Sequence, residues 1–327
     1  MAVLVTGGAG YIGSHMVAEL MENNIGAVVL DNLSTGNKEA VLCEKFYLGD
    51  IRNRDDLNRV FSENDIDSVI HFAASSLVGE SVAQPLKYYD NNVYGTSVLL
   101  DAMISHDVRD IVFSSTAAVY GDSDEIPITE DTPVNPMSPY GETKLAMEKM
   151  IEWASRAYGM NYVSLRYFNA CGAHKNGKIG EWRTNETHLI PIILQYVMGI
   201  RDSFNVFGND YDTSDGTCIR DYIHVVDLVK AHTAALAYLK NGGKSDIFNL
   251  GIGNGFSVLE IIKAAERVVG SEILYGISKR RAGDPAVLIA SNAKAKKMLS
   301  WDYGVTDPVE IITDAWNFYL NHPNGYK

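Results

Sequence analysis

The stretch Thr6-Gly7-Gly8-Ala9-Gly10-Tyr11-Ile12-Gly13 lies between a short apolar segment, residues 2–6, and a segment with helical periodicity, residues 11–22. Its glycines have the spacing Gly-x-Gly-x-x-Gly, which permits a tight turn and a close approach of the backbone to a pyrophosphate. The start of the following helix would stabilise that anion. Asp31 closes the next expected strand, where a carboxylate would bond the 2′-hydroxyl of an adenosine ribose and repel a 2′-phosphate. Together these features predict a dinucleotide site that prefers NAD to NADP.

Apolar strands and longer amphipathic helices alternate through the first half of the chain. This alternation is typical of βαβ units, so we predict an α/β fold with a doubly wound, Rossmann-type parallel sheet that helices cover on both faces. The expected strands are residues 2–6, 27–30, 45–48, 68–71, 111–114 and 162–166, and the expected helices are residues 11–22, 55–64, 85–105 and 139–158.

The second half of the chain is less regular and contains glycine-rich loops. Helices are expected at residues 189–198, 226–240 and 258–269, and residues 247–250 have the pattern of one more strand of the main sheet. We therefore expect an NAD-binding domain over residues 1–168, to which later segments near 225–250 return. A smaller mixed α/β domain that binds the substrate is expected over residues 169–327.

The composition argues against several classes of protein. Of the 327 residues 46% are hydrophobic and 21% are charged, which is ordinary for a globular chain, and the formal net charge of −13 argues against a nucleic-acid binder. No apolar run approaches the ~18–20 residues of a membrane span, and the opening segment lacks the basic region of a signal peptide. The cysteines Cys43, Cys171 and Cys218 form no Cys-x-x-Cys pair, which favours the reducing cytoplasm. The histidines show no metal-ligand spacing, so we expect no metal site.

A tyrosine and a lysine four residues apart, Tyr140 and Lys144, follow Ser138-Pro139, a good N-cap and first position for a helix. The spacing puts both side chains on one helix face, where an ammonium group would favour the phenolate form of the tyrosine. The pattern alone is common in a chain with 18 tyrosines. Thr116, however, follows the expected strand 111–114, and the carboxyl ends of parallel strands form the ligand site of such a sheet. These three side chains beside a dinucleotide turn predict a hydride-transfer site.

Further motifs extend along the chain. They are His71-Phe72-Ala73-Ala74, Leu77-Val78-Gly79-Glu80-Ser81, Tyr88-Tyr89-Asp90-Asn91-Asn92, Arg166-Tyr167-Phe168-Asn169, Phe207-Gly208-Asn209-Asp210-Tyr211, Arg220-Asp221-Tyr222-Ile223-His224, Arg280-Arg281-Ala282-Gly283-Asp284-Pro285 and His322-Pro323-Asn324-Gly325-Tyr326. With the glycine turn and the Tyr-x-x-x-Lys pair, they resemble the extended short-chain dehydrogenase/reductase family, and within it most closely the UDP-glucose 4-epimerases.

The resemblance implies roles for individual residues. One departure is Ser76, where a branch of the family carries a lysine towards the pyrophosphate, so this chain would hold its cofactor somewhat less tightly. The catalytic residues would be Tyr140, Lys144 and Thr116. The cofactor-binding residues would be Gly7, Gly10, Tyr11, Ile12, Gly13, Asp31, Asn32, Leu33, Ser34, Thr35, Gly36, Asp50, Ile51, Phe72, Ala73, Ala74, Ser76, Asn91, Thr116, Tyr140, Lys144 and Phe168. The substrate-binding residues would be Thr116, Tyr140, Asn169, His188, Leu189, Asn205, Phe207, Arg220, Arg281, Asp284 and Leu288.

The expected activity is therefore the interconversion of UDP-glucose and UDP-galactose with tightly bound NAD, in a cytoplasmic C2 homodimer that binds neither membrane nor nucleic acid. A 4,6-dehydratase is disfavoured, because Ala117 and Ala118 stand where that family has an acid pair that moves protons. An epimerase of UDP-uronates or UDP-pentoses remains an alternative, and so does a redox-sensing NAD-binding regulator that has lost catalysis. By resemblance, Leu288 lies at the sugar 2-position and leaves more room than a tyrosine, which predicts some activity on UDP-N-acetylhexosamines.

Overall fold

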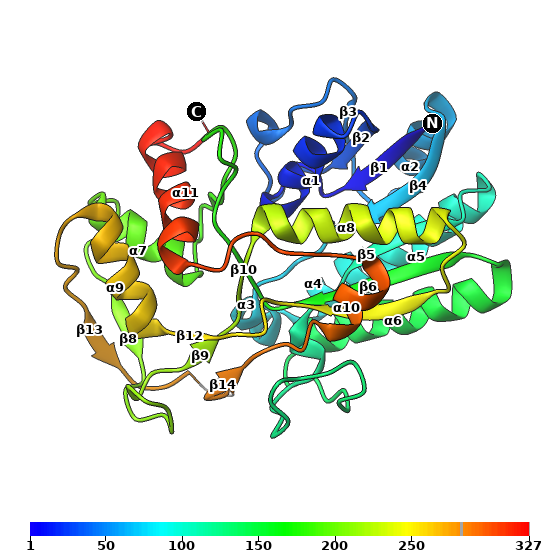
Figure 1. The fold of residues 1–327 in the computed structure, drawn as a ribbon. Helices are drawn as coiled ribbons and strands as arrows, with labels where there is room; N and C mark the ends of the chain where they lie inside the picture. The colour runs from blue at the N-terminus through cyan, green and yellow to red at the C-terminus, as the bar shows by residue number, and fades with distance from the viewer. Residues whose placement is uncertain (282–283, 327) are drawn as a thin grey trace.

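The computed structural model describes residues 1–281 and 284–326, and a seven-stranded parallel sheet lies at its centre (Figure 1). The strand order is β11-β6-β5-β4-β1-β2-β3, so the direction of winding reverses between β1 and β4. Such a reversal opens a crevice for a ligand at the carboxyl ends of the strands. This confirms the predicted doubly wound α/β fold. The strands are β1 (Ala2–Thr6), β2 (Gly26–Asp31), β3 (Phe46–Leu48), β4 (Ile66–His71), β5 (Asp110–Ser114), β6 (Asn161–Tyr167) and β11 (Asp246–Leu250).

Helices cover both faces of this sheet because successive side chains of each strand point to opposite sides. In β1, Val3 and Val5 pack with α1 (Tyr11–Glu22) and α8 (Val225–Lys240). Leu4 packs on the other face with α2 (Arg54–Glu63), α5 (Gly95–Ser105) and α6 (Pro139–Tyr158). Figure 1 shows α8 above β5 and β6 and α6 below them.

The long helix expected at residues 85–105 is helical throughout but not uniformly α-helical. It consists of α4 (Pro85–Tyr88), the π-helical segment η2 (Tyr89–Tyr94) and α5. A π-helical turn holds one residue more than an α-helical turn, which a hydrophobic period of 3.6 does not reveal. The segment carries Asn91 and Asn92 and follows the short helix α3 (Val78–Ala83), which the sequence pattern did not predict.

Later segments of the chain return to the sheet with α8 and β11. Strand β11 pairs in parallel with β6, and α8 packs against α1. Late in the chain, α10 (Ala293–Leu299) packs beside α8 and β11. On these contacts we propose the division into two domains near residue 168 that the sequence suggests.

The remaining helices surround a separate apolar core. Ile193, Ile261 and Phe318 belong to this core, one from each of three helices that Figure 1 shows grouped beside the sheet. These helices are α7 (Leu189–Val197), α9 (Val258–Val269) and α11 (Pro308–Asn321). The short strands around them are β7 (Asn169–Cys171) with β10 (Tyr222–His224), β8 (Asn205–Phe207) with β13 (Gly276–Ser278), and β9 (Ile219–Arg220) between β12 (Phe256–Ser257) and β14 (Val287–Leu288).

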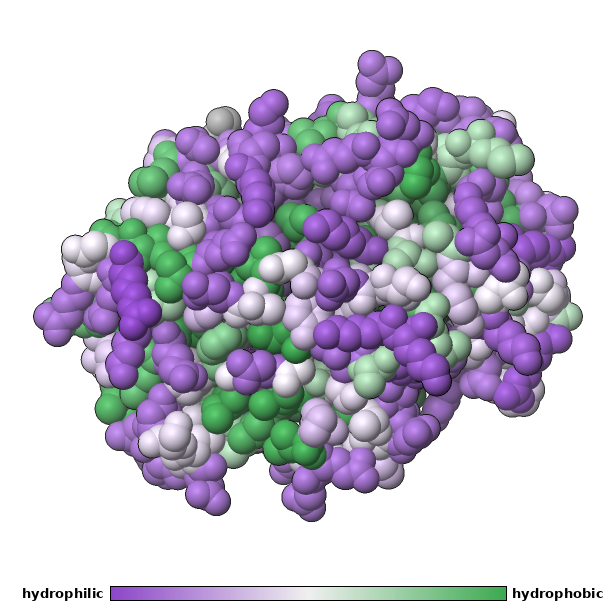
Figure 2. All heavy atoms as spheres, in the orientation of Figure 1, coloured by the Kyte–Doolittle hydropathy of each residue, from purple (hydrophilic) through white to green (hydrophobic). Residues whose placement is uncertain are grey.

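The surface is mainly polar on the face drawn in Figure 2, where apolar side chains occur as scattered groups between hydrophilic ones. Within the described part of the chain, no helix is both long enough and apolar enough to cross a bilayer.

Candidate active site

The glycine turn brings β1 and the loop after β4 into close contact. Gly7 has a φ of +75°, and a Cβ atom there would lie 2.7 Å from the backbone nitrogen of Ala73. A Cβ atom at Gly13 would overlap the carbonyl oxygen of Gly7. Helix α1 begins at Tyr11 without a side-chain cap, so its first backbone N–H groups point towards the crevice without a side-chain acceptor. The turn therefore presents a backbone donor site of the kind that binds a pyrophosphate.

Asp31 is nearly buried at the end of β2 and is fixed by two backbone amides. Ala9 N–H donates to Oδ2 at 3.0 Å and Leu33 N–H donates to Oδ1 at 2.8 Å, while burial raises the pKa of the carboxyl group. Each carboxylate oxygen has a further lone pair, so the group can still accept a ribose hydroxyl. The Asn32 amide donates to Asp50 at 3.0 Å, which joins the loops after β2 and β3.

The other cofactor-binding candidates also follow the carboxyl ends of the sheet strands. In a doubly wound sheet, ligands bind in a crevice at this edge. Asn32, Leu33, Ser34, Thr35 and Gly36 follow β2, Asp50 and Ile51 follow β3, Phe72, Ala73, Ala74 and Ser76 follow β4, Thr116 follows β5 and Phe168 follows β6, while Asn91 lies in η2.

The Tyr-Lys pair lies at the start of α6, as its sequence predicts. The Ser138 hydroxyl accepts the Gly141 N–H at 3.2 Å and Pro139 takes the first helical position. One turn on, the buried Lys144 amine donates to the carbonyl oxygen of Ser114 at 2.7 Å, at the end of β5. Thr116 follows two residues later, at the same edge of the sheet. The structure thus brings the three predicted catalytic residues together.

The electrostatics of this group differ from the expectation in one respect. Burial lowers the pKa of Lys144 to about 7, although Glu148 raises it. Burial raises the pKa of Tyr140, while the Thr116 hydrogen bond and the charge of Arg183 lower it. From the sequence, we expected the Lys144 ammonium group, a bound nicotinamide cation and the helix N-terminus to favour the phenolate of Tyr140. The chain's own groups leave Tyr140 as a phenol at neutral pH, and the structure adds Arg183 to the charges that act on it.

Two buried polar contacts that sequence reasoning missed hold this group in place. Glu148 accepts the Ser115 hydroxyl at 2.5 Å and pairs with the Arg166 guanidinium at 2.6 Å. Asn92, in the π-helical segment, bonds the backbone of Ser75 and donates to the Thr143 hydroxyl at 3.1 Å. Glu148 lies four residues after Lys144, so the helical period that linked Lys144 to Tyr140 could have shown that it shares their face.

Most substrate candidates lie on short strands of the smaller domain. Arg220 on β9 pairs with Asp284 at 2.5 Å and lies opposite Leu288 of β14. The Arg281 guanidinium lies 4.3 Å from the centre of the Phe207 ring. Leu288 and Phe168 pack on one apolar cluster with Leu145 of α6, Val119, Tyr120 and Ile128. Asn169 is on β7, Leu189 begins α7 and Asn205 begins β8; Ala282 and Gly283 of the Arg-Arg-Ala-Gly-Asp-Pro motif lie outside the described residues.

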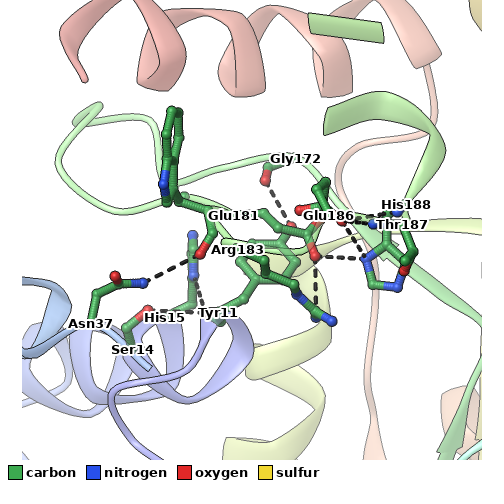
Figure 3. Close-up of polar contacts among 12 residues, drawn as sticks. Tyr11, Ser14, His15, Asn37, Gly172, Glu181, Arg183, Glu186, Thr187 and His188 are labelled. Carbon is green, nitrogen blue, oxygen red and sulfur yellow. Dashed lines mark hydrogen bonds and ion pairs between the residues drawn. The ribbon is translucent and has the colours of Figure 1, made fainter. Parts of the chain in front are cut away.

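His188 belongs to an ionic cluster that the sequence did not indicate (Figure 3). Its Nδ1 lies 2.6 Å from Glu181 Oε1, and the Arg183 guanidinium lies 3.2 Å from the same oxygen. Glu186 accepts the backbone N–H groups of Thr187 and His188, each at 2.8 Å. Glu181 and His188 are seven residues apart on an irregular segment, where no periodicity links them.

The same cluster bears on the expectation that the protein has no metal site. Glu181, Glu186 and His188 could each offer a ligand atom within 4.8 Å of the others. The guanidinium of Arg183 already contacts the Glu181 oxygen, and His188 Nδ1 is bonded to it. A cation held against this carboxylate by the chain itself favours an ion-pair cluster over a metal centre.

Comparison with known proteins places this site in a family. A sequence model of the NAD dependent epimerase/dehydratase family matches residues 3–251. The chain belongs to this family. The UDP-glucose 4-epimerase of Halalkalibacterium halodurans is 54% identical over 327 residues, which are 100% of this chain and 98% of the relative.

Solved structures of the family are similar over almost the whole length. The crystal structure of UDP-glucose 4-epimerase from Bifidobacterium longum in complex with NAD+ and UDP is 42% identical, with a TM-score of 0.93, and covers 99% of this chain and 100% of its own. The UDP-Glc/GlcNAc 4-epimerase of Campylobacter jejuni is 40% identical, with a TM-score of 0.85, and covers 98% of this chain and 99% of its own.

The residues of this chain fit the family's cofactor. The uncapped start of α1 and the glycines whose Cβ atoms would clash form a pyrophosphate cradle. Asp31 has the acceptors that an adenosine ribose needs, and its charge favours NAD over NADP. Ser76 is exposed and brings no positive charge to this cradle.

Proposed function

We propose that this protein interconverts UDP-glucose and UDP-galactose, by oxidising C4 of the sugar to a ketone and reducing it again on the opposite face. One observation carries the proposal: the buried Lys144, one turn after Tyr140 on α6, donates to the carbonyl oxygen of Ser114 and so holds the Tyr-Lys pair next to Thr116, at the sheet edge that bears the glycine turn. A phenol and a hydroxyl at this edge can move a proton on and off a sugar hydroxyl. The full-length similarity to curated UDP-glucose 4-epimerases supports the choice of substrate.

NAD, when bound, supplies the reversible hydride acceptor for C4. As the phenolate, which the positive charge of bound NAD would favour, Tyr140 would take the proton of the 4-hydroxyl group and return it after the sugar has turned. The Thr116 hydroxyl orients the 4-oxygen, and its hydrogen bond lowers the pKa of Tyr140. Lys144, anchored on the carbonyl oxygen of Ser114, is placed to hold the nicotinamide ribose. Each turnover restores the cofactor, so it need not leave.

The smaller domain is proposed to bind the UDP group. Arg220 and Arg281 suit the diphosphate because guanidinium groups match phosphate oxygens, and Asp284 suits a ribose hydroxyl. Arg220 and Asp284 are already paired at 2.5 Å, so both are held at one edge of β9. A sugar anchored only through its diphosphate can turn about that linkage and present either face to Tyr140.

The alternative activities are disfavoured for different reasons. A dehydratase needs acid groups that this site lacks, whereas a regulator and the other epimerases are distinguished by measuring turnover. After Thr116, Ala117 and Ala118 form the start of a short 3-10 helix and carry no acid for a dehydration. A regulator without catalysis would not need both Tyr140 and Lys144 at the crevice. Epimerisation of UDP-uronates or UDP-pentoses would use the same chemistry at C4 and differs from the proposed reaction only in the C5 substituent that the pocket must accommodate.

Some activity on UDP-N-acetylhexosamines is a second proposal. Leu288 is only partly buried and packs next to Phe168, on the cluster that contains Leu145 of the catalytic helix. A leucine here is smaller than a tyrosine and leaves room beside the sugar. A relative named for both UDP-Glc and GlcNAc shares 40% of the sequence.

The assembly is proposed to be a C2 homodimer in the cytoplasm. Leu86, Tyr89 and Tyr94 along the long helix and Trp153 on α6 are exposed, with Leu86 at 81% and Trp153 at 66%. Apolar helix faces of this kind pair in symmetric four-helix interfaces. The cytoplasm is favoured because Cys43, Cys171 and Cys218 are free thiols.

The deciding experiment incubates the purified protein with UDP-galactose and without added NAD, then separates the products. UDP-glucose should form until both sugars are present at equilibrium. Formation of a 4-keto-6-deoxy sugar would identify a dehydratase instead. NAD content without any turnover would identify the regulator.

A further inference from the structure

The segment after the glycine-rich loop of the smaller domain holds a buried carboxylate between two cationic side chains. The Glu181 side chain is 4% exposed, and its Oε1 atom is the partner of both His188 Nδ1, at 2.6 Å, and Arg183, at 3.2 Å. Figure 3 shows the imidazole ring and the guanidinium group meeting this oxygen from different sides. The His188 side chain is 45% exposed, so its remaining ring nitrogen can reach a ligand.

The backbone of this segment is fixed independently of those ion pairs. Glu186 Oε1 accepts the N–H groups of Thr187 and His188, and Arg201 donates to the Glu186 carbonyl oxygen at 2.8 Å. His188 is also the residue before helix α7. The backbone of this loop therefore does not depend on Glu181, whose carboxylate instead contacts the ring of His188.

The charges on the cluster follow from its geometry. An ionised carboxylate only accepts hydrogen bonds, so His188 Nδ1 carries the proton that lies towards Glu181. The Glu181 carboxylate raises the pKa of His188, against burial and the charge of Arg183, and Glu186 adds to the increase. The His188 and Arg183 cations in turn hold the pKa of Glu181 below its usual value despite burial, whereas burial and the Glu181 charge raise the pKa of Glu186.

We propose that Glu181 is a positioning residue for substrate binding, whose buried carboxylate aims His188 and Arg183 as a pair of cationic donors at the diphosphate of the nucleotide sugar. This proposal rests on the proposed function for the identity of the ligand. A diphosphate has oxygen acceptors that match an imidazolium and a guanidinium group, and charge-assisted bonds to such oxygens are strong. Arg183 was not among the residues that the sequence indicated. Burial raises the pKa of Tyr140, and the charge of Arg183 is among the effects that lower it.

The test replaces Glu181 by glutamine, which keeps the size of the side chain and removes its charge. In Glu181→Gln, KM for UDP-galactose should rise about tenfold while kcat stays within about twofold, because the loss of a charge-assisted contact weakens binding by about this factor. The dissociation constant of UDP, measured by calorimetry without turnover, should rise in parallel. The His188 ring, followed by NMR, should titrate at a lower pH than in the wild type.

A matched control is available in the same cluster. Glu186 lies 3.9 Å from His188 Nδ1, but its Oε1 atom holds backbone amides, a contact that the amide oxygen of glutamine can keep. Glu186→Gln should change KM, UDP affinity and the His188 titration less than Glu181→Gln does. Equal effects of the two variants would overturn the proposal, because they would indicate only a general loss of loop structure.

Other outcomes also decide against the proposal. Unchanged KM, UDP affinity and His188 titration in Glu181→Gln would overturn it, and so would a loss confined to kcat. Stabilisation of the wild type by zinc that is absent from Glu181→Gln would assign the three residues to a metal site instead. If the wild type fails to convert UDP-galactose although UDP binding and the His188 titration respond as expected, the proposed function fails and the positioning role of Glu181 stands.

Discussion

At the level of single residues, the proposed base, Tyr140, has a raised pKa, and its neighbour Lys144 has a lowered pKa. Burial raises the pKa of Tyr140 and lowers that of Lys144 to about 7. A lysine that is only partly protonated near neutral pH is a weak source of charge for the tyrosine. The Thr116 hydrogen bond and the Arg183 charge therefore contribute to its activation, together with whatever charge the bound cofactor adds.

Removing the phenol hydroxyl is the direct test of the proton transfer. Tyr140→Phe should lower kcat by about 10²–10⁴-fold, the range in which positioned acid–base groups contribute. The aromatic ring stays, so NAD content and the circular dichroism spectrum should match those of the wild type. Turnover close to the wild-type rate, in protein with normal cofactor content, would show that another group is the base.

Lys144 provides a prediction for stability against pH. Below about pH 7 the lysine is charged in both the folded and the unfolded states, so the folded state bears the full cost of burying the charge. As the pH rises from 7 towards the unfolded pKa, the folded state loses the proton first and this cost disappears. Lys144→Met should therefore be more stable relative to the wild type at pH 6.5 than at pH 9.5, by on the order of a few kcal/mol.

The measurement is urea denaturation of both proteins, freed of nucleotide, across this pH range. A difference between them that is constant with pH, or that grows as the pH rises, would mean that the lysine is not held in a depressed state. Loss of the hydrogen bond to the Ser114 carbonyl oxygen lowers the free energy of unfolding of Lys144→Met by a similar amount at both pH values, so it does not affect the change with pH.

At the level of elements, α6 carries two of the three proposed catalytic residues and the carboxylate that holds them in place. Its first turn carries Tyr140, its second carries Lys144, and its third carries Glu148. Glu148 and Arg166 of β6 form an ion pair in which both side chains are 5% exposed. The same carboxylate bonds Ser115, next to Thr116. One buried pair thus fixes the helix against the two strands that end at the site.

Breaking this pair should be costly because it leaves a charge buried without a partner. Glu148→Gln should lower the free energy of unfolding by about 3–5 kcal/mol. Glu152→Gln on the same helix breaks an exposed pair with Arg156 and should cost less than about 1 kcal/mol. Urea denaturation of the two variants measures the contrast, and similar losses in both would show that the Glu148–Arg166 pair contributes little.

The sequence predicts regular elements well where local signals agree. Helices α1, α6 and α9 have the predicted bounds, and α6 has Ser138 at its cap, Pro139 at its first position and Gly159, at a φ of +66°, at its end. The predicted strand at residues 2–6 has the observed bounds, and the other predicted strands differ from the observed ones by one or two residues at one or both ends. The fold class follows from the alternation of these elements, which depends little on exact bounds.

Other parts of the structure depend on contacts between distant segments. The π-helical segment, the short strand pairs of the smaller domain and the Glu181–His188 pair have no period that a local pattern can display. Tyr140, Lys144 and Thr116 could be grouped because each has a defined place on a helix or at a strand end. Arg183 could not be assigned to this group, because it lies on an irregular segment whose position depends on the tertiary structure.

At the level of the whole molecule, the exposed apolar side chains of the long helix and α6 predict the assembly. Trp153→Glu should convert a dimer into a monomer, because it puts a charge into an interface that would have to desolvate it. Light scattering after size exclusion gives the mass. Leu320→Glu changes another exposed apolar position, on α11, and should leave the dimer intact. A monomeric wild type, or a Trp153→Glu variant that stays dimeric, would contradict this interface.

Substrate breadth depends on how the two domains meet. Leu288 lies on β14 of the smaller domain, opposite Arg220, yet packs on the cluster that includes Leu145 of α6 and Tyr120. In the proposed binding mode, side chains of this cluster would bound the sugar, and the size of residue 288 would set the room beside it. We expect the main activity on UDP-galactose and UDP-glucose, with detectable turnover of UDP-N-acetylgalactosamine.

Leu288→Tyr should then reduce the activity on the N-acetylated substrate far more than that on UDP-galactose, because added bulk acts only where the acetamido group must fit. The measurement compares kcat/KM for both substrates in the variant and the wild type. Leu288→Met, which conserves volume, is the control and should change both values little. An equal loss on both substrates in Leu288→Tyr would show that Leu288 supports the packing between Arg220 and the catalytic helix and does not select the sugar. The absence of N-acetyl turnover in the wild type would equally contradict the prediction, since the room left by the leucine would then be closed by another residue.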